Sequence, residues 1–92
     1  MFELTGFQRD LLYVIAGADR PSGQQIKESI SEDVGEVNHG RLYPNLDTLV
    51  ERGLVVKGQH DRRTNYYQIS EEGKAAIRQR REWEDQFVPF VE

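Results

Sequence analysis

The hydrophobic pattern is most regular between Asn38 and Arg52. A set of apolar residues recurs there at the spacing of one helical face: Leu42, Leu46, Leu49 and Val50. Asn38 can cap the start of such a helix, and Gly53 can adopt the left-handed turn that ends it. Hydrogen-bonding side chains occupy the opposite face: Asn38, Arg41, Asn45 and Thr48. The pattern predicts a helix suited either to a DNA major groove or to an ordinary place on the protein surface.

Pro44 lies inside this stretch and allows two interpretations. The helix either begins at Pro44, because the first helical position accepts proline, or begins near Asn38 and bends at the proline. Leu42 is in phase with Leu46, which favours one continuous helix with a kink in its early turns.

Two further helices are predicted before it. Thr5 to Gly17 begins with a capping box formed by Thr5 and Gln8. Its apolar stripe is broad enough to leave part of it for another subunit: Phe7, Leu11, Leu12, Val14 and Ile15.

The second helix begins after Pro21, with Ser22 as its cap and Gln25 as the reciprocal partner, and is expected to end near Glu32. A short second helix, a turn and a third helix follow the helix-turn-helix order. Gln24 and Lys27 would then lie near a phosphate backbone, although exposed polar residues on a helix need no such role.

Two β-prone runs follow, Leu54 to His60 and Tyr66 to Ile69, joined by a polar tip from Asp61 to Asn65. They predict a hairpin. Alternation places Leu54 with Val56 on one face of the first strand, and Tyr67 with Ile69 on one face of the second. Arg62 and Arg63 at the tip are either solvated charge or, behind a helix-turn-helix, a grip on a DNA backbone or narrow minor groove.

Ser70 can cap a last helix, which Pro89 is expected to end. Residues spaced by four and three form a coiled-coil-like seam: Ala76, Arg80, Trp83, Phe87 and Phe90. Three aromatic residues are too apolar to leave in water on so small a domain. They pack either on the first helix or on a second subunit, and the projecting position of the helix favours the dimer.

Composition narrows the function classes. A chain of 92 residues has room for one domain with a small core, which suits pairing with a second copy. The absence of cysteine excludes disulfides and thiolate metal sites. The sequence has no apolar run near the roughly 18 residues needed to cross a bilayer and no signal-peptide pattern, so a cytoplasmic location without membrane attachment is expected.

The net charge of −4 argues against a general nucleic-acid binder, but the charge is unevenly distributed. Residues 38–67 hold five Lys or Arg against three Asp or Glu, whereas the parts on either side are net acidic. The basic part contains the third helix and the hairpin, as a DNA-binding surface would. Nine Arg against three Lys, with the acidic excess, hint at a salt-adapted source.

The stretch from Gly40 to Val55, with its Leu-Tyr-Pro-x-Leu-x-x-Leu core followed by Gly-Leu-Val, resembles the PadR family of winged-helix transcriptional regulators. The hairpin exit from Tyr67 to Lys74 is similar to the family's Tyr-x-Leu-Thr-x-x-Gly segment. The resemblance covers about residues 7–77. It implies a homodimeric, repressor-type DNA binder that dimerises through its last and first helices, with Tyr43 on the DNA backbone and the early third helix in the major groove.

This sequence departs from the family pattern at several positions. Gly23 is followed by Gln24 where the family often has Gly-Tyr, and Gly40 by Arg41 where Gly-Thr or Gly-Ser is usual. Arg41 adds a charge where DNA would lie, and a bidentate arginine–guanine contact contributes about 1–3 kcal/mol of discrimination. Many members carry a long C-terminal helical region that this sequence lacks, so an effector pocket built from it is not implied.

The predicted fold is mainly α with a small β-hairpin: a winged helix-turn-helix over residues 1–69 and a C-terminal dimerisation helix over residues 70–92. The predicted partners are double-stranded DNA and a second copy of the chain. The predicted DNA-binding residues are Gln24, Lys27, Asn38, His39, Arg41, Tyr43, Asn45, Arg62, Arg63 and Thr64. The predicted dimer interface comprises Phe7, Leu11, Trp83, Phe87 and Phe90.

Three alternatives remain at this stage. A winged-helix interaction module without DNA binding could dock through the aromatic last helix, and it gains support if Asp47, Glu51 and Asp61 cancel the positive potential. A small aromatic effector could bind beside Trp83 at a dimer interface. An enzyme is the weakest alternative, because His39 and His60 match no metal motif and no phosphate loop or nucleophile elbow is present, so no catalytic residue, metal or cofactor is predicted.

Overall fold

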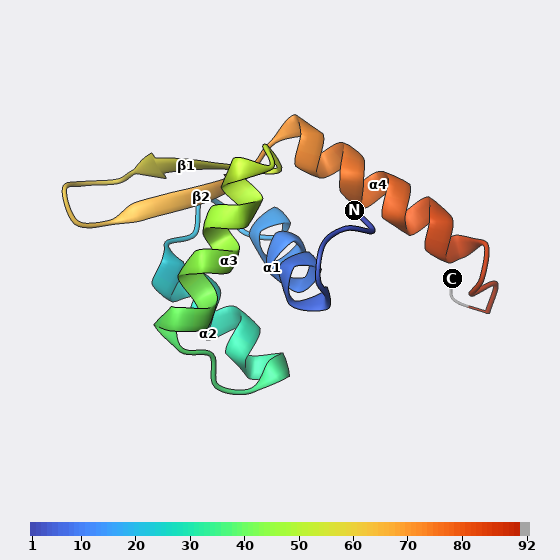
Figure 1. The fold of residues 1–92 in the computed structure, drawn as a ribbon, viewed down its shortest axis with the longest axis horizontal. Helices are drawn as coiled ribbons and strands as arrows, with labels where there is room; N and C mark the ends of the chain where they lie inside the picture. The colour runs from blue at the N-terminus through green and yellow to red at the C-terminus, as the bar shows by residue number, and fades with distance from the viewer. Residues whose placement is uncertain (91–92) are drawn as a thin grey trace.

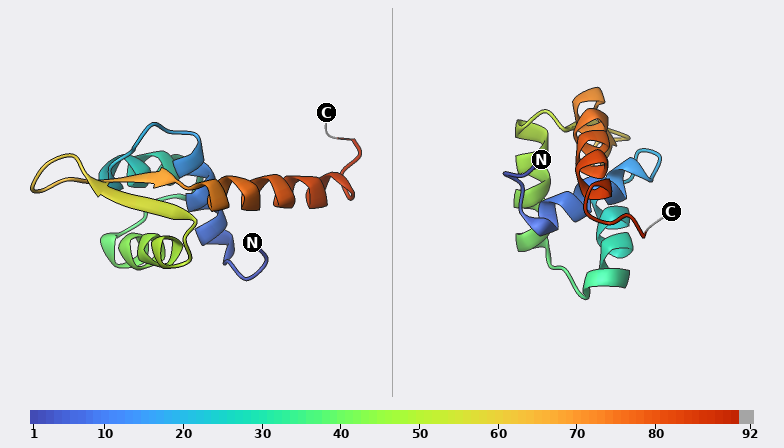
Figure 2. Two further views of the ribbon diagram at one scale, coloured as in Figure 1. Left: turned by 90° about the horizontal axis from the view of Figure 1, so that it is seen from above. Right: turned by 90° about the vertical axis from the view of Figure 1, so that its right-hand side faces the viewer.

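The computed structural model describes residues 1–90, which contain four helices and one two-stranded antiparallel hairpin (Figure 1). The elements are α1 (Gly6–Ala16), α2 (Gly23–Val34), α3 (His39–Glu51), β1 (Val55–Gln59), β2 (Asn65–Ile69) and α4 (Glu71–Asp85). The first three helices and the base of the hairpin form one body. The hairpin tip and α4 project from it in opposite directions (Figure 2), over a length of 46 Å. The predicted winged helix-turn-helix with a C-terminal helix is confirmed.

The predicted helix starts are confirmed by their caps. The side chains of Thr5 and Ser22 accept the backbone N–H groups of Gln8 and Gln25, and both capping boxes are complete. Asn38 and Ser70 cap α3 and α4 through their own side-chain oxygens. Each cap satisfies a backbone donor that the helix itself cannot pair. At its other end α2 runs to Val34, slightly beyond the predicted end near Glu32.

Helix α3 runs without interruption from His39 to Glu51, with Pro44 inside it. The continuous helix is therefore confirmed, and a start at Pro44 is excluded. Gly53 has a φ of 76°, the left-handed conformation expected after the helix. The bend at Pro44 stays a prediction.

The core lies between the three helices and the inner face of the hairpin. The central side chain of the hairpin face is Tyr67, which is almost fully buried, and burial followed by the nearby Asp47 raises its pKa. The buried apolar side chains from the rest of the chain are Leu4, Leu11, Leu12, Ile15, Ile26, Ile30, Val37, Leu42, Leu46, Leu49 and Val55.

The hairpin corrects one prediction. Val55 pairs with Ile69 and Lys57 with Tyr67, so Val55 and Tyr67 share the buried face. Val56, predicted to share an inner face with Leu54, points outward and is 51% exposed. The predicted phase is wrong by one residue because Leu54 precedes the strand: its N–H donates to Leu49 at the end of α3.

Helix α4 also ends earlier than predicted, at Asp85 rather than near Pro89. The N–H of Phe87 donates to the Glu84 carbonyl at 2.9 Å, a tighter turn than an α-helix. Proline disfavours helical backbone in the residue before it, here Val88, so the chain leaves the helix before Pro89. Phe87 and Phe90 consequently lie beyond the helix and not on a continuous helical seam. None of the helices found in residues 1–90 has the length and apolar character needed to cross a membrane.

Candidate nucleic-acid interface

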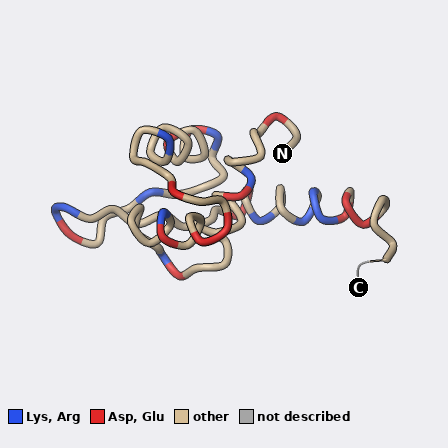
Figure 3. The backbone as a smooth tube through the Cα atoms, turned by 90° about the horizontal axis from the view of Figure 1, so that it is seen from below, with Lys and Arg blue, Asp and Glu red and all other residues tan. Residues whose placement is uncertain are grey.

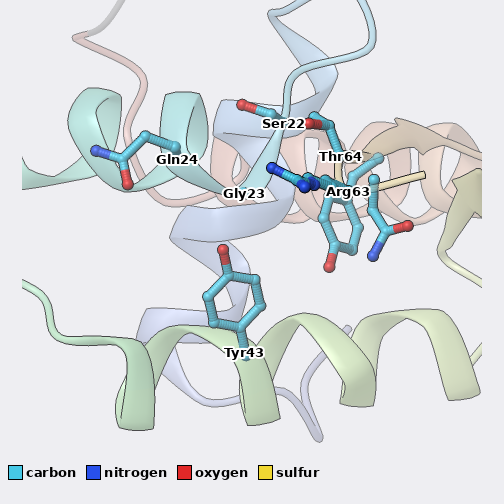
Figure 4. A pocket seen from close by; sticks show the side chains of 8 residues that line it. Ser22, Gly23, Gln24, Tyr43, Arg63 and Thr64 are labelled. Carbon is cyan, nitrogen blue, oxygen red and sulfur yellow. The ribbon is translucent and has the colours of Figure 1, made fainter. Parts of the chain in front are cut away.

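A solvent-open hollow of about 330 Å³ lies where the start of α2, the first half of α3 and the hairpin tip meet (Figure 4). Its shape depends on Gly23. A Cβ at this position would lie 2.5 Å from the Tyr43 hydroxyl, so only glycine lets Tyr43 rest against the start of α2. The residues lining the hollow are Ser22, Gly23, Gln24, Tyr43, Arg63, Thr64, Asn65 and Tyr67.

The lining of the hollow favours an anion. The first backbone N–H groups of a helix have no acceptor within the helix, and they carry the positive end of its dipole. Ser22 caps only the N–H of Gln25. The Arg63 side chain reaches from the hairpin toward Gly23, and the Tyr43 hydroxyl points to the same place from α3 (Figure 4). No acidic side chain lines the hollow.

The hairpin tip is ordered by Asp61. One of its carboxylate oxygens accepts the backbone N–H groups of Arg63 at 2.8 Å and Thr64 at 2.9 Å. These two hydrogen bonds, that from Arg63 foremost, hold the pKa of Asp61 below its ordinary value. The side chains of Arg62 and Arg63 are exposed, so the hairpin tip carries two cations beside the carboxylate of Asp61 (Figure 3).

The polar face predicted for α3 is largely committed to other parts of the chain. The Asn45 side chain accepts from Gln8 of α1 at 3.0 Å and donates to the Arg41 carbonyl at 2.7 Å. Thr48 donates to the Pro44 carbonyl. Asn45 therefore lies in the contact between α1 and α3, and not on a free DNA-reading face.

Arg41 is exposed, but its guanidinium carbon lies 3.9 Å from the centre of the Phe7 ring. This is the geometry of a cation–π contact. The arginine has no carboxylate partner in residues 1–90, so its hydrogen-bonding groups remain available. Asn38 is exposed at the helix start, and the His39 ring packs edge-on against Tyr43.

The hollow thus brings together part of the predicted site: Gln24, Tyr43, Arg63 and Thr64. Arg62 lies at the adjacent tip, whereas Lys27 is half-buried further along α2 and does not line the hollow. The sequence-based prediction missed four lining residues: Ser22, Gly23, Asn65 and Tyr67. Ser22 was recognised only as a cap, and no local pattern signals that a glycine on one helix makes room for a tyrosine on another.

The predicted dimer residues fall into two groups. Leu11 is fully buried in this chain's own core, so its place at a dimer interface is wrong. Helix α1 contacts α2, α3, β2 and, less extensively, α4. Phe7 lies under Arg41 on the α3 side. By contrast Phe87 and Phe90 are 62% and 81% exposed.

Trp83 is 38% exposed and lies in a cluster with Phe2, Arg80 and Phe87. Its ring contacts Phe2 and Phe87 with centroids 5.0 Å apart in each case, and the Arg80 guanidinium lies 4.5 Å from it. A second open hollow, of about 390 Å³, lies between α1 and the end of α4, but Trp83 does not line it. Its lining residues are Tyr13, Arg81, Glu84, Asp85 and Val88. An effector site beside Trp83 stays a prediction.

Comparison with known proteins gives a consistent result. A family model described as the transcriptional regulator PadR-like family matches residues 11–79. The structure of H. salinarum RosR grown from NaBr is 47% identical, with a TM-score of 0.85 over 91% of this chain and 76% of that chain. The complex structure of hsRosR-S1, also 47% identical, gives a TM-score of 0.88 over 95% and 79% of the two chains.

The same fold occurs in more distant structures. Streptococcus pneumoniae FabT in complex with DNA is 16% identical, with a TM-score of 0.75 over 97% of this chain and 60% of that chain. At this identity the likeness concerns the fold alone. Among curated protein sequences the comparison found no significant match.

Proposed function

The chain belongs to the PadR-like family of transcriptional regulators, and we propose that it acts as a homodimeric repressor on a two-fold operator in the cytoplasm. As a family member with a winged-helix fold it is a DNA-binding regulator. The assignment of DNA-contacting residues rests on the hollow where α2, α3 and the hairpin tip meet, because its lining favours an anion.

A backbone phosphate of the duplex occupies this hollow. The N–H groups at the start of α2, the Tyr43 hydroxyl and the Arg63 guanidinium are the donors that would hold it. Phosphate contacts of this kind fix the position of the protein on the duplex without reading its sequence.

Base recognition comes from the first turns of α3 in the major groove. Arg41 leaves the Phe7 ring to reach a guanine edge, and exposed Asn38 and His39 lie beside it. The wing carries Arg62 into the neighbouring minor groove. Asp47 and Glu51 are exposed on α3, so phosphate contacts are few and the salt dependence is shallow.

Two copies pair through aromatic residues on the last turns of α4 and just beyond it. Phe87 and Phe90 are exposed in the single chain, and Phe2 and Trp83 extend the same apolar patch. Two recognition helices would then meet half-sites about 34 Å apart on the duplex.

The test uses duplexes selected by the protein from a randomised pool, titrated at several salt concentrations. Arg63→Ala removes the cation of the hollow and is expected to weaken binding roughly tenfold and to lower the salt slope by about 0.9. Arg78→Ala removes an exposed arginine on α4 and serves as the matched control. Binding by Arg63→Ala equal to that of the parent would exclude the hollow as a phosphate site, and selection no better than for random DNA would exclude sequence-specific binding.

A further inference from the structure

Arg20, in the turn between α1 and α2, has a backbone conformation unusual for its type. Its φ is 46°, and no other residue except glycine has a positive φ within residues 1–90. A side chain with a Cβ is disfavoured in this region, where glycine is accommodated without cost. The turn would form more easily with glycine, which directs attention to what the arginine side chain does.

The side chain of Arg20 lies against the outer face of the hairpin. Its guanidinium carbon is 5.3 Å from the centre of the Tyr66 ring. Nε2 of His60 lies 3.2 Å from the Arg20 carbonyl, to which the ring N–H donates, and the His60 ring also packs on Tyr66 at 4.9 Å. Gly58, opposite Tyr66 across the strands, leaves space for this ring, because a Cβ there would collide with it. Tyr66 thus holds the guanidinium of Arg20, and His60 holds its backbone carbonyl.

The charge of Arg20 is not neutralised by an ion pair. The residue is exposed, and it forms no ion pair in the part of the chain that the structure describes. This includes its sequence neighbour Asp19 and Asp61 of the hairpin tip, whose carboxylate instead accepts backbone N–H groups. An exposed cation with a restrained position is suited to binding an anion.

The hairpin separates this cation from the hollow. Successive residues of a strand point to opposite faces, so Asn65 and Tyr67 line the hollow while Tyr66 and Arg20 lie on the other side. A wing inserted into a minor groove, which is about 6 Å wide, has a phosphate strand on each side.

We propose that Arg20 binds a DNA phosphate on the strand opposite to the one held in the hollow, so that the wing is fixed from both faces. The inference rests on the DNA-binding function proposed above. Tyr66 and His60 act as positioning residues for Arg20, since the Tyr66 ring lies under its guanidinium and His60 binds its carbonyl.

Arg20→Gly separates this role from a structural one. The substitution removes the guanidinium but relieves the backbone, so the melting temperature is expected to stay unchanged or to rise. Affinity for the selected duplex is expected to fall roughly five- to tenfold, with the salt slope smaller by about 0.9. Arg20→Lys, which keeps the charge, should retain the parent slope.

Parent, Arg63→Ala and Arg20→Gly are titrated on the same duplex. If Arg63→Ala weakens binding and Arg20→Gly leaves both affinity and slope unchanged, the inference is overturned while the proposed function stands. A weaker Arg20→Gly with the parent slope also overturns it, because loss of a brace alone releases no fewer counterions. A parent protein that binds no duplex would remove the proposed function itself.

Discussion

At the scale of single residues, Asp61 would have two opposed effects on the proposed DNA contact of the hairpin tip. Its carboxylate holds the backbone of Arg63 and Thr64 in place, yet it puts a negative charge beside the two arginines of the tip. The alternative of an interaction module without DNA binding, in which Asp61 helps to cancel the positive potential, considers only the second effect. The hydrogen bonds add the first effect, because the carboxylate holds the backbone of the tip at Arg63 and Thr64.

Substitutions at Asp61 should separate the two effects. Asp61→Ala removes the acceptor, so amide exchange at Arg63 and Thr64 is expected to accelerate. Asp61→Asn retains an acceptor oxygen without the charge, so it should keep the tip ordered and bind DNA at least as well as the parent. Hydrogen exchange followed by NMR and duplex titrations provide the measurements. Equal protection in Asp61→Ala and the parent would contradict the ordering role.

The same carboxylate predicts a direction of pH dependence. Because the pKa of Asp61 is lowered in the folded tip, its contribution is fully present above the ordinary pKa of aspartate. It is lost as the pH falls through the lowered value. Protection of the Arg63 and Thr64 amides should therefore decline toward acid in the parent and stay level in Asp61→Asn.

At the scale of elements, the sequence predicts the features that depend on residues close together in the chain. The capping residues Thr5, Ser22, Asn38 and Ser70 marked four helix starts correctly, because a cap acts on backbone groups within three residues. The predicted orientation of the β1 side chains is wrong by one residue, because it depends on how the chain leaves α3. The predicted end of α4 near Pro89 is too late, because the residue before a proline already disfavours helical backbone.

The site was predicted in part for the same reason. The arginines of the tip and Tyr43 are recognisable within their own segments, but the neighbours of a helix face are not. Asn45 has the side chain of a base-reading residue, and nothing near it in sequence shows that Gln8 binds it. Likewise, Gly23 gains its role only from the approach of Tyr43.

The hydrogen bond from Gln8 of α1 to Asn45 of α3 yields a prediction, for which Gln25 of α2 provides the control. Gln8 and Gln25 both accept the N–H of their helix cap, but Gln8 is buried and also donates to Asn45. Gln8→Glu keeps the capping acceptor and removes the donor, so the free energy of unfolding should fall by about 1–3 kcal/mol. Gln25→Glu, exposed at the first turn of α2, should be neutral or slightly stabilising. Urea denaturation of both variants would decide, and equal stabilities would contradict a structural link through Gln8.

At the scale of the whole molecule, the proposed DNA-binding surface and the proposed dimer contact lie far apart. The hairpin tip and the end of α4 point away from each other along the longest dimension (Figure 2). The exposed Arg62 and Arg63 lie at one end, and the exposed Phe87 and Phe90 lie at the other. The family resemblance implies such a division, whereas the net charge of −4 does not, because it sums the basic segment of residues 38–67 with the acidic parts on either side.

The exposed aromatic end carries the last prediction. Phe87→Ser removes a ring that is 62% exposed in the single chain, so the stability of the protomer should change little. If the ring is buried between two copies, its loss should weaken the dimer at least tenfold, since burial of a phenylalanine contributes about 1.5–3 kcal/mol. Val56→Ser, which removes an exposed apolar side chain from the hairpin, is the control. Sedimentation equilibrium would measure the association, and a parent that remains monomeric at micromolar concentration would contradict the dimer.

The same variant has an expected effect on DNA binding, because one dimer must hold both half-sites of the operator. Phe87→Ser should therefore bind the operator with a steeper dependence on protein concentration than the parent. A protein that binds DNA as a monomer would show no loss of binding.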